Sequence, residues 1–182
     1  MRLTIATVGR LKYGPERQLI ERYSDLLGGL GRSCGFAPLN IIELPEARAS
    51  QPAMRRQDEA QRLVGATSAA GCRVLLDERG SEMTSEKLST FLGNERDGGT
   101  REIALLIGGA DGHGDLARAL TQKTLALSQF TLPHGLARIV LAEPGRNVHD
   151  TRPVLGGHEV RGHDSESAAF LLRGVSCAMK KH

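Results

Sequence analysis

Two short stretches with uninterrupted apolar centres constrain the fold of this chain more than any other feature. Arg73–Asp77 (RVLLD) and Ile103–Ile107 (IALLI) lack the polar–apolar alternation of a strand with one solvated face. Such runs are typical of strands that are buried on both faces, as in parallel sheets covered by helices on each side. They predict an α/β fold, with a parallel sheet and helices on both faces.

The rest of the chain supplies the alternating strands and helices that such a sheet requires. Strands are also predicted at Leu3–Val8, Leu39–Leu44 and Leu125–Ser128. Pro133 is predicted to open the last helix, because proline in the first helical turn loses no needed hydrogen bond. The other predicted helices cover residues 17–30, 53–70, 84–92 and 114–122, and Thr84 or Ser85 is the expected N-cap of the helix at 84–92. The resulting order, five strands each followed by a helix, indicates a parallel arrangement.

Composition restricts the class of protein. The 182 residues, 40% hydrophobic and 25% charged, suit one domain or one domain with an appendage. With 3% aromatic residues and no Trp, a broad base-stacking platform for RNA is not expected. The net charge of +3 permits a nucleic-acid partner without demanding one. Because the chain starts directly with a strand pattern and has no long apolar run, we expect a cytoplasmic protein without a signal peptide or membrane span.

No metal site is expected from the cysteines and histidines. Cys34, Cys72 and Cys177 are widely spaced and form no C-x-x-C pair, so buried, reduced thiols are the expectation. The histidines at 149, 158, 163 and 182 have no spacing typical of metal ligands.

Three loops are predicted at the carboxyl ends of strands, where ligands bind in open α/β sheets. The first contains Asp77, which could hold a ribose or only cap its loop. The second, Gly108–Gly114, matches neither the dinucleotide-binding nor the P-loop spacing, so both a structural turn and a ligand contact stay open. The third is Leu127–His134. His134 itself could be a general base, a phosphate donor, or a structural residue bonded to nearby backbone.

Four motifs together resemble the RlmH family, the ribosomal RNA large-subunit pseudouridine-N3 methyltransferases of the SPOUT superfamily. They are VGRLK (Val8–Lys12), LLDERG (Leu75–Gly80), LLIGGADG (Leu105–Gly112) and LALSQFTLPHGLARIVLAE (Leu125–Glu143), in the family's order and spacing. The resemblance implies a SPOUT-type domain with a C-terminal trefoil knot, working as a homodimer. It also implies S-adenosyl-L-methionine as cofactor and N3 of a pseudouridine in 23S rRNA, in the ribosome, as the methylated atom.

The resemblance also implies which residues contact the cofactor. They are Leu76, Gly108, Leu127, Ser128, Gln129, Phe130, Thr131 and Leu132. Apolar members of this set can sandwich adenine, and the main chain of the last six can bind its polar edge. Gly108 is expected to let the nucleoside lie against the backbone. No catalytic residue is assigned, although His134 and Arg138 are expected near the pocket.

After Glu143 the sequence departs from the family. Relatives continue with Gln, an aliphatic residue and Tyr-Arg-Ala, whereas this chain has Pro144-Gly145 and lacks the terminal Tyr-His-Arg cluster. We therefore expect a methyltransferase domain over residues 1–143 and an atypical, poorly ordered tail over 144–182. A shift of reading frame and a genuinely altered tail both explain the departure.

The alternative to an active methyltransferase is thus a catalytically impaired SPOUT protein that still binds RNA or the ribosome. A nucleotide-binding α/β protein with an unrelated reaction is disfavoured by the missing phosphate-loop spacings.

Overall fold

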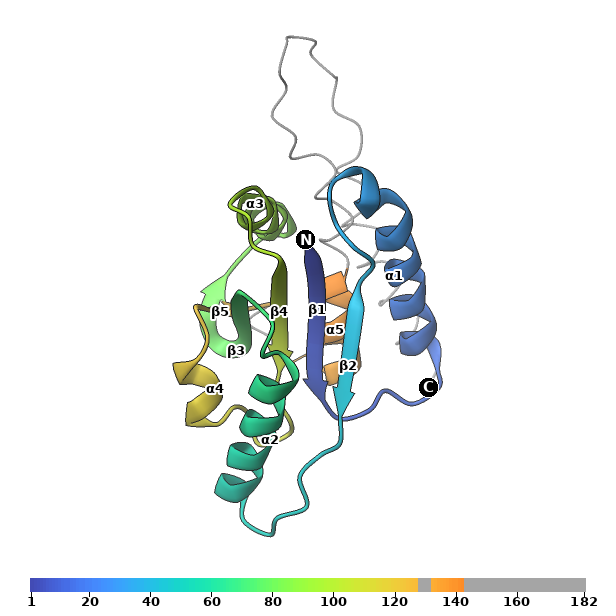
Figure 1. Cartoon of the computed structure of the whole chain (residues 1–182). Coiled ribbons are helices and arrows are strands. Elements are labelled where there is room, and N and C mark those ends of the chain that lie inside the picture. Colours follow the sequence, from blue (N-terminus) through green and yellow to red (C-terminus); the bar gives the residue numbers. More distant parts are fainter. Residues whose placement is uncertain (128–131, 143–182) are drawn as a thin grey trace. The chain divides into compact units, whose positions relative to one another are not determined.

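Every pairing between the strands described in the structure is parallel. The computed structural model describes residues 1–127 and 132–142. Its sheet has the order β2-β1-β4-β3-β5, drawn in Figure 1. The strands are β1 (Arg2–Val8), β2 (Asn40–Leu44), β3 (Cys72–Glu82), β4 (Glu102–Ile107) and β5 (Lys123–Ala126). The helices are α1 (Pro15–Ser33), α2 (Pro52–Ala66), α3 (Ser85–Asp97), α4 (Asp115–Ala119) and α5 (His134–Ala142).

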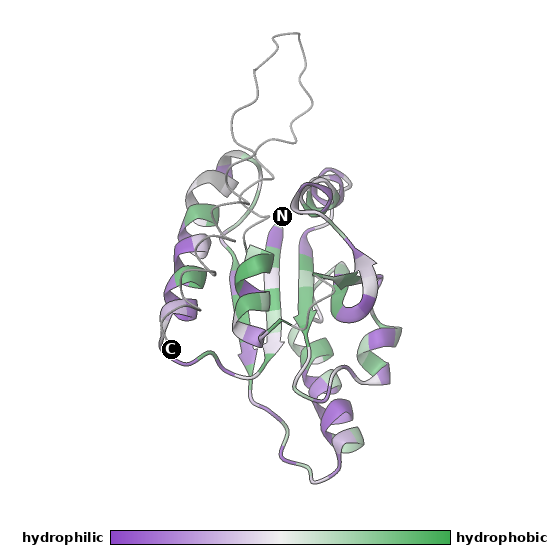
Figure 2. Cartoon of the chain, turned by 180° about the vertical axis from the view of Figure 1, so that it is seen from behind, coloured by the Kyte–Doolittle hydropathy of each residue, from purple (hydrophilic) through white to green (hydrophobic). Residues whose placement is uncertain are grey.

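The helices cover the two faces of the sheet in alternation. Successive residues of β4 point to opposite faces, so Leu105 packs in a cluster with residues of α1, α3 and α5. Leu106 packs in a second cluster with residues of α2 and α4. In Figure 1, α2 lies in front of the sheet and α5 behind it. Figure 2, seen from behind, shows α5 as mainly hydrophobic and α1 as alternately hydrophilic and hydrophobic. The predicted parallel α/β sheet with helices on both faces is confirmed.

Local sequence signals set several helix ends. The Thr84 hydroxyl accepts a 3.2 Å hydrogen bond from the Lys87 amide and so caps α3, as predicted for Thr84 or Ser85. Pro133 stands immediately before α5, and its carbonyl accepts from the Ala137 amide at 3.0 Å. Two other helices, α1 and α2, also have proline in their first turn.

The largest difference from the predicted elements is in β3. The prediction ended at Asp77, where the apolar run ends, but the strand continues to Glu82. The chain leaves the ladder after Leu76 and rejoins it at Ser81, and both residues pair with Leu125 of β5. Pairing needs only backbone groups, so the polar segment has no hydrophobic signal. In addition, β5 begins at Lys123 and ends at Ala126, earlier than predicted, and α4 is shorter.

Some predictions concern residues outside the described ranges. Residues 143–182, which include the predicted tail, and residues 128–131 are among them, so the division near residue 143 and the trefoil knot stay predictions. Within the described ranges, Cys34 and Cys72 are buried, as expected. None of the helices in these ranges has both the length and the apolar character needed to cross a membrane.

Candidate functional site

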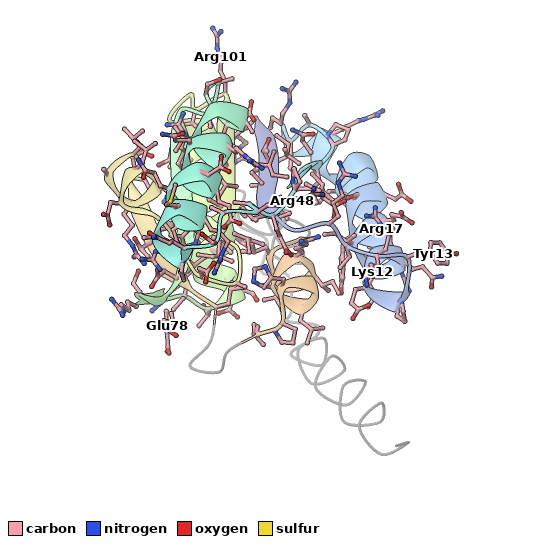
Figure 3. The ribbon with its side chains drawn as sticks, turned by 90° about the horizontal axis from the view of Figure 1, so that it is seen from below. Lys12, Tyr13, Arg17, Arg48, Glu78 and Arg101 are labelled. Atoms are coloured by element: carbon pink, nitrogen blue, oxygen red, sulfur yellow. The ribbon has the colours of Figure 1, made fainter. Side chains whose placement is uncertain are left out.

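The three loops predicted at the carboxyl ends of strands meet around one cavity of about 670 Å³. It lies at the interruption of β3 after Leu76 and at the carboxyl ends of β4 and β5, on the end of the sheet that faces the viewer in Figure 3. Such a volume is within the range of about 300–1,000 Å³ typical of small-ligand sites. Its wall combines aliphatic side chains with the backbone of the glycine-rich loop and with charged groups such as Asp77 and Arg79.

Four of the eight predicted cofactor contacts line this cavity. They are Leu76, Gly108, Leu127 and Leu132, from three segments that are far apart in the sequence. The other four, Ser128, Gln129, Phe130 and Thr131, lie outside the described residues. The structure thus brings the described members of the set together.

The LLDERG motif forms one wall by leaving the β3–β5 ladder between Leu76 and Ser81. Gly80 makes this path possible, because a Cβ there would lie 2.6 Å from the Leu125 carbonyl carbon and 2.7 Å from the Ala126 nitrogen. No side chain fits between these two backbone segments, so glycine is required at this position.

Asp77 has contacts that fit a loop-capping role. One carboxylate oxygen accepts from the Arg79 amide at 3.0 Å, and the other pairs with Arg118 at 2.5 Å. Burial alone would raise the pKa of Asp77, but the Arg79 amide and the Arg118 guanidinium together lower it. The carboxylate is therefore ionised at neutral pH, with both oxygens engaged by the protein.

His113 links two walls of the cavity and was not singled out by the sequence reasoning. Its ring is within 2.6 Å of the Leu76 carbonyl through Nε2, which must carry the proton because a carbonyl only accepts. The residue is 8% exposed, and its buried Nδ1 has no hydrogen-bond partner among the described residues. Burial lowers the pKa of His113. The Leu76 carbonyl and Asp77 act in the opposite direction, but the net pKa is below the ordinary value. An uncharged imidazole therefore joins the Leu76 loop to the glycine-rich loop. The Gly-His-Gly triplet after a buried strand was the available signal.

The glycines of the second loop are explained by close packing. A Cβ on Gly108 would lie 3.0 Å from the His113 ring, and one on Gly109 would lie 2.5 Å from Oε2 of Glu59. Glu59 is a buried residue of α2 that accepts from the Ala47 amide at 2.9 Å. The loop is therefore a structural turn pressed against α2 and His113, and its backbone also lines the cavity.

The two residues expected near the pocket have different locations. His134 begins α5, is exposed and lines the cavity. Partial desolvation of its ring and the nearby Arg138 guanidinium lower the pKa of His134. Arg138 is 2% exposed and does not line the cavity. Its Nη1 pairs with Glu43 at 2.7 Å, and its Nη2 donates to the Gly9 carbonyl at 2.8 Å.

Glu43 pairs with a second arginine, Arg17, as well as with Arg138. Its other oxygen pairs with Arg17 at 2.9 Å. Burial would raise the pKa of Glu43, but the Leu11 amide, Arg17 and Arg138 together lower it. We call Arg17, Glu43 and Arg138 the ion network. Across the described parts of the chain, no cluster of three His, Cys, Asp or Glu side chains could hold a metal ion.

Comparisons with known proteins agree on one family. A family model described as predicted SPOUT methyltransferase matches residues 1–144. Proteins named Ribosomal RNA large subunit methyltransferase H are 39% identical in Brucella anthropi, 38% in Brucella abortus and 39% in Xanthobacter autotrophicus. Each alignment covers 87% of this chain and 97% of the relative. A crystal structure of a putative methylase family protein from Neisseria gonorrhoeae has 13% identity and a TM-score of 0.47, over 100% of this chain and 94% of that one, too weak a likeness to add support.

Proposed function

Because the chain belongs to the SPOUT methyltransferase family, we propose that it methylates ribosomal RNA of the large subunit. The proposed donor is S-adenosylmethionine, and the proposed acceptor is N3 of a pseudouridine in 23S rRNA. The observation that carries this proposal is the similarity to large-subunit rRNA methyltransferases along nearly their whole length. The same similarity disfavours the alternative of a catalytically impaired RNA-binding protein.

The described residues of the cavity fit the proposed donor. Leu76, Leu127 and Leu132 provide aliphatic surface for an adenine ring, as the resemblance implies. Gly108 contributes backbone without a side chain. The buried His113 ties the glycine-rich loop to the Leu76 loop through its bond to the Leu76 carbonyl. Asp77, ionised and held by Arg79 and Arg118, places negative charge on the wall near where a sulfonium could bind. Ser128–Thr131, between Leu127 and Leu132, complete the proposed set of contacts.

The chemistry required of the protein is mainly positioning. S-adenosylmethionine supplies an already activated methyl group, so alignment of the base nitrogen with that methyl gives most of the acceleration. The N3–H bond must also break as the N–C bond forms, and its proton needs an acceptor. His134 fits this role best, because it is the exposed imidazole on the cavity wall and its lowered pKa keeps it uncharged at neutral pH. His113 cannot serve, since Nε2 is bonded to Leu76 and Nδ1 is buried.

Assembly and location complete the proposal. Helices α1 and α5 contact each other, and each exposes an aliphatic side chain, Leu19 and Val140. These residues offer apolar surface to a second copy in the proposed homodimer. The same proposal includes the C-terminal trefoil knot and the ribosome as the substrate. It also includes a cytoplasmic location, because ribosomes are found there.

The test separates donor binding from methyl transfer. Titration calorimetry measures binding of S-adenosylmethionine, and a methyl-transfer assay uses ribosomes that lack the modification. We expect the chain to bind the donor and to methylate one pseudouridine. L76R places a charge in the cavity and should weaken donor binding at least about tenfold. L116R, on an exposed leucine that does not line the cavity, is the matched control and should bind normally.

The outcomes distinguish the two functions. A folded protein that does not bind S-adenosylmethionine would contradict the proposal. Binding without transfer would favour the catalytically impaired alternative. For the proton acceptor, H134N should lower kcat about 100-fold or more while leaving donor affinity unchanged, and should remove the acidic limb of the pH–rate profile.

A further inference from the structure

The loop between β1 and α1 exposes an aromatic side chain to an unusual degree for this protein. Tyr13 is 86% exposed, although the chain contains only two Tyr and no Trp. Arg10 and Lys12 are exposed on the same loop. Figure 3 shows Lys12 and Tyr13 projecting on the same side, near Arg17. A single exposed Tyr is normal on a protein surface, but this one has two exposed cations beside it on a loop whose backbone is held in place.

The side chains of the ion network hold the backbone of this loop in place by hydrogen bonds. The Leu11 amide donates to Glu43 at 2.8 Å, and the Leu11 carbonyl accepts from Nη2 of Arg17 at 2.6 Å. Arg138 donates to the Gly9 carbonyl at 2.8 Å, and the Gly9 amide donates to the Leu44 carbonyl at 2.8 Å. Side chains on such a loop lose less backbone freedom when they bind a partner.

The exposed cations of the loop are not neutralised by the described residues. Arg17 and Arg138 share Glu43, but neither Arg10 nor Lys12 forms an ion pair within the described ranges. The acidic neighbours on the surface, Glu16 and Glu46, form no ion pair with them there. The loop therefore combines an exposed aromatic ring with two cations that are free to meet an anion.

The loop also borders the candidate site. Leu11 packs on the first turn of α5, since a Cβ built on Gly135 would lie 3.3 Å from its Cδ1. The residue before Gly135 is His134, which lines the cavity. In Figure 3, α5 lies between Glu78, a cavity residue, and the side that carries Lys12 and Tyr13. A nucleotide chain whose target base enters the cavity would thus pass within reach of the loop.

We propose that Arg10, Lys12 and Tyr13 bind the rRNA strand beside the target nucleotide, with Tyr13 stacking on one unpaired base and the two cations contacting phosphates. This inference rests on the proposed function. The chemistry favours RNA because rings stack on bases of any sequence and cations bind phosphate oxygens. The low aromatic content excludes a broad platform, but a single ring is enough for one base. A second copy of the chain is the rival occupant, and the mass of the variants in solution distinguishes it from RNA.

The experiment measures the dissociation constant for unmodified ribosomes by co-sedimentation, independently of turnover. We expect Y13A to raise this constant about tenfold and Y13F, which keeps the ring, to restore it. The double variant R10A/K12A should lower the slope of log affinity against log salt by about one to two. R101A is the matched control. Arg101 is exposed and forms no ion pair within the described residues, and it stands just before β4, at the amino-terminal end of the sheet, whereas Arg10 follows the carboxyl end of β1. It should leave affinity and slope unchanged.

Donor binding and oligomeric state identify the reason for any failure. All variants should bind S-adenosylmethionine like the wild type and sediment with the same mass. Equal ribosome affinity of wild type and Y13A overturns the inference while the proposed function stands. A change of mass in Y13A also overturns it and assigns the loop to a contact between copies. A wild type that does not bind ribosomes contradicts both proposals.

Discussion

The two ends of the candidate site are built in opposite ways. On the cavity side, the chain packs too closely to accept a side chain at three glycines. Gly80 faces the backbone of β5, whereas Gly108 and Gly109 face the side chains of His113 and Glu59. On the side of the Gly9–Gly14 loop, the backbone is held by charged side chains, above all the buried Arg138 and the partly buried Glu43. Adding a methyl group should destabilise the first side by steric overlap. Removing one partner of an ion pair should destabilise the second side by leaving a charge unpaired.

The largest effect is expected on the charged side. E43A leaves Arg138 buried with only the Gly9 carbonyl as an acceptor, and it also removes the acceptor of the Leu11 amide. We expect the free energy of unfolding to fall by about 4 kcal/mol, measured by urea denaturation. E46A, a change of the same type at an exposed carboxylate, should cost less than about 0.5 kcal/mol. Equal effects of the two variants would mean that the ion network does not stabilise the loop.

A slightly smaller effect is expected for a single methyl group on the cavity side. G80A should lower the free energy of unfolding by about 3 kcal/mol, because the new Cβ would overlap the backbone of Leu125 and Ala126. It should also weaken donor binding by displacing the Leu76 loop. G65A, where nothing lies within 4 Å of the new Cβ, should instead stabilise α2 by up to about 1 kcal/mol. Denaturation of both variants, with calorimetry for donor binding, provides the check. A G80A protein as stable as the wild type would refute the steric account.

Acidification should affect the two sides in different pH windows. The pKa of His113 is lowered by burial, so its contribution to stability is complete above its ordinary value of 6.5 and decreases as the pH falls below it. The pKa of Glu43 is lowered from 4.5, so the network's contribution persists to lower pH and is lost only as the pH falls below 4.5.

H113Q tests this difference, because Gln keeps an N–H donor but does not titrate. It should be less stable than the wild type at pH 7.5, yet lose less stability between pH 7 and 5. His134, whose pKa is also lowered, contributes to both proteins alike. Urea denaturation at several pH values gives the comparison. A parallel decline of both proteins would show that His113 is not the titrating group.

The smallest effect is expected for D77N. The amide oxygen can still accept from the Arg79 amide, and the lost partner, Arg118, is about 41% exposed. We expect a loss of less than about 1 kcal/mol in stability and a change of donor affinity within about threefold. A larger loss of affinity, found by calorimetry, would show that Asp77 holds the ribose as well as its loop.

Much of the fold and part of the site could be predicted from the sequence. The buried runs around Leu75 and Leu105 indicated a parallel sheet, and Thr84 was correctly placed as a helix cap. The resemblance to a family gave the set that includes Leu76, Gly108, Leu127 and Leu132, and the described members do line one cavity. The return of β3 to the ladder at Ser81 was missed, because backbone pairing leaves no mark on hydrophobicity.

The sequence by itself determined the order and type of the elements, because periodicity and capping act between residues a few positions apart. Only the tertiary structure decided the strand order, the bond from His113 to the Leu76 carbonyl, and the pairing of Arg138 with Glu43, which is 95 positions away. These contacts arise when the crossover connections bring distant loops to one edge of the sheet. Their strength depends on the burial of these polar groups, which the residues next to His113, Glu43 or Arg138 in the sequence do not specify.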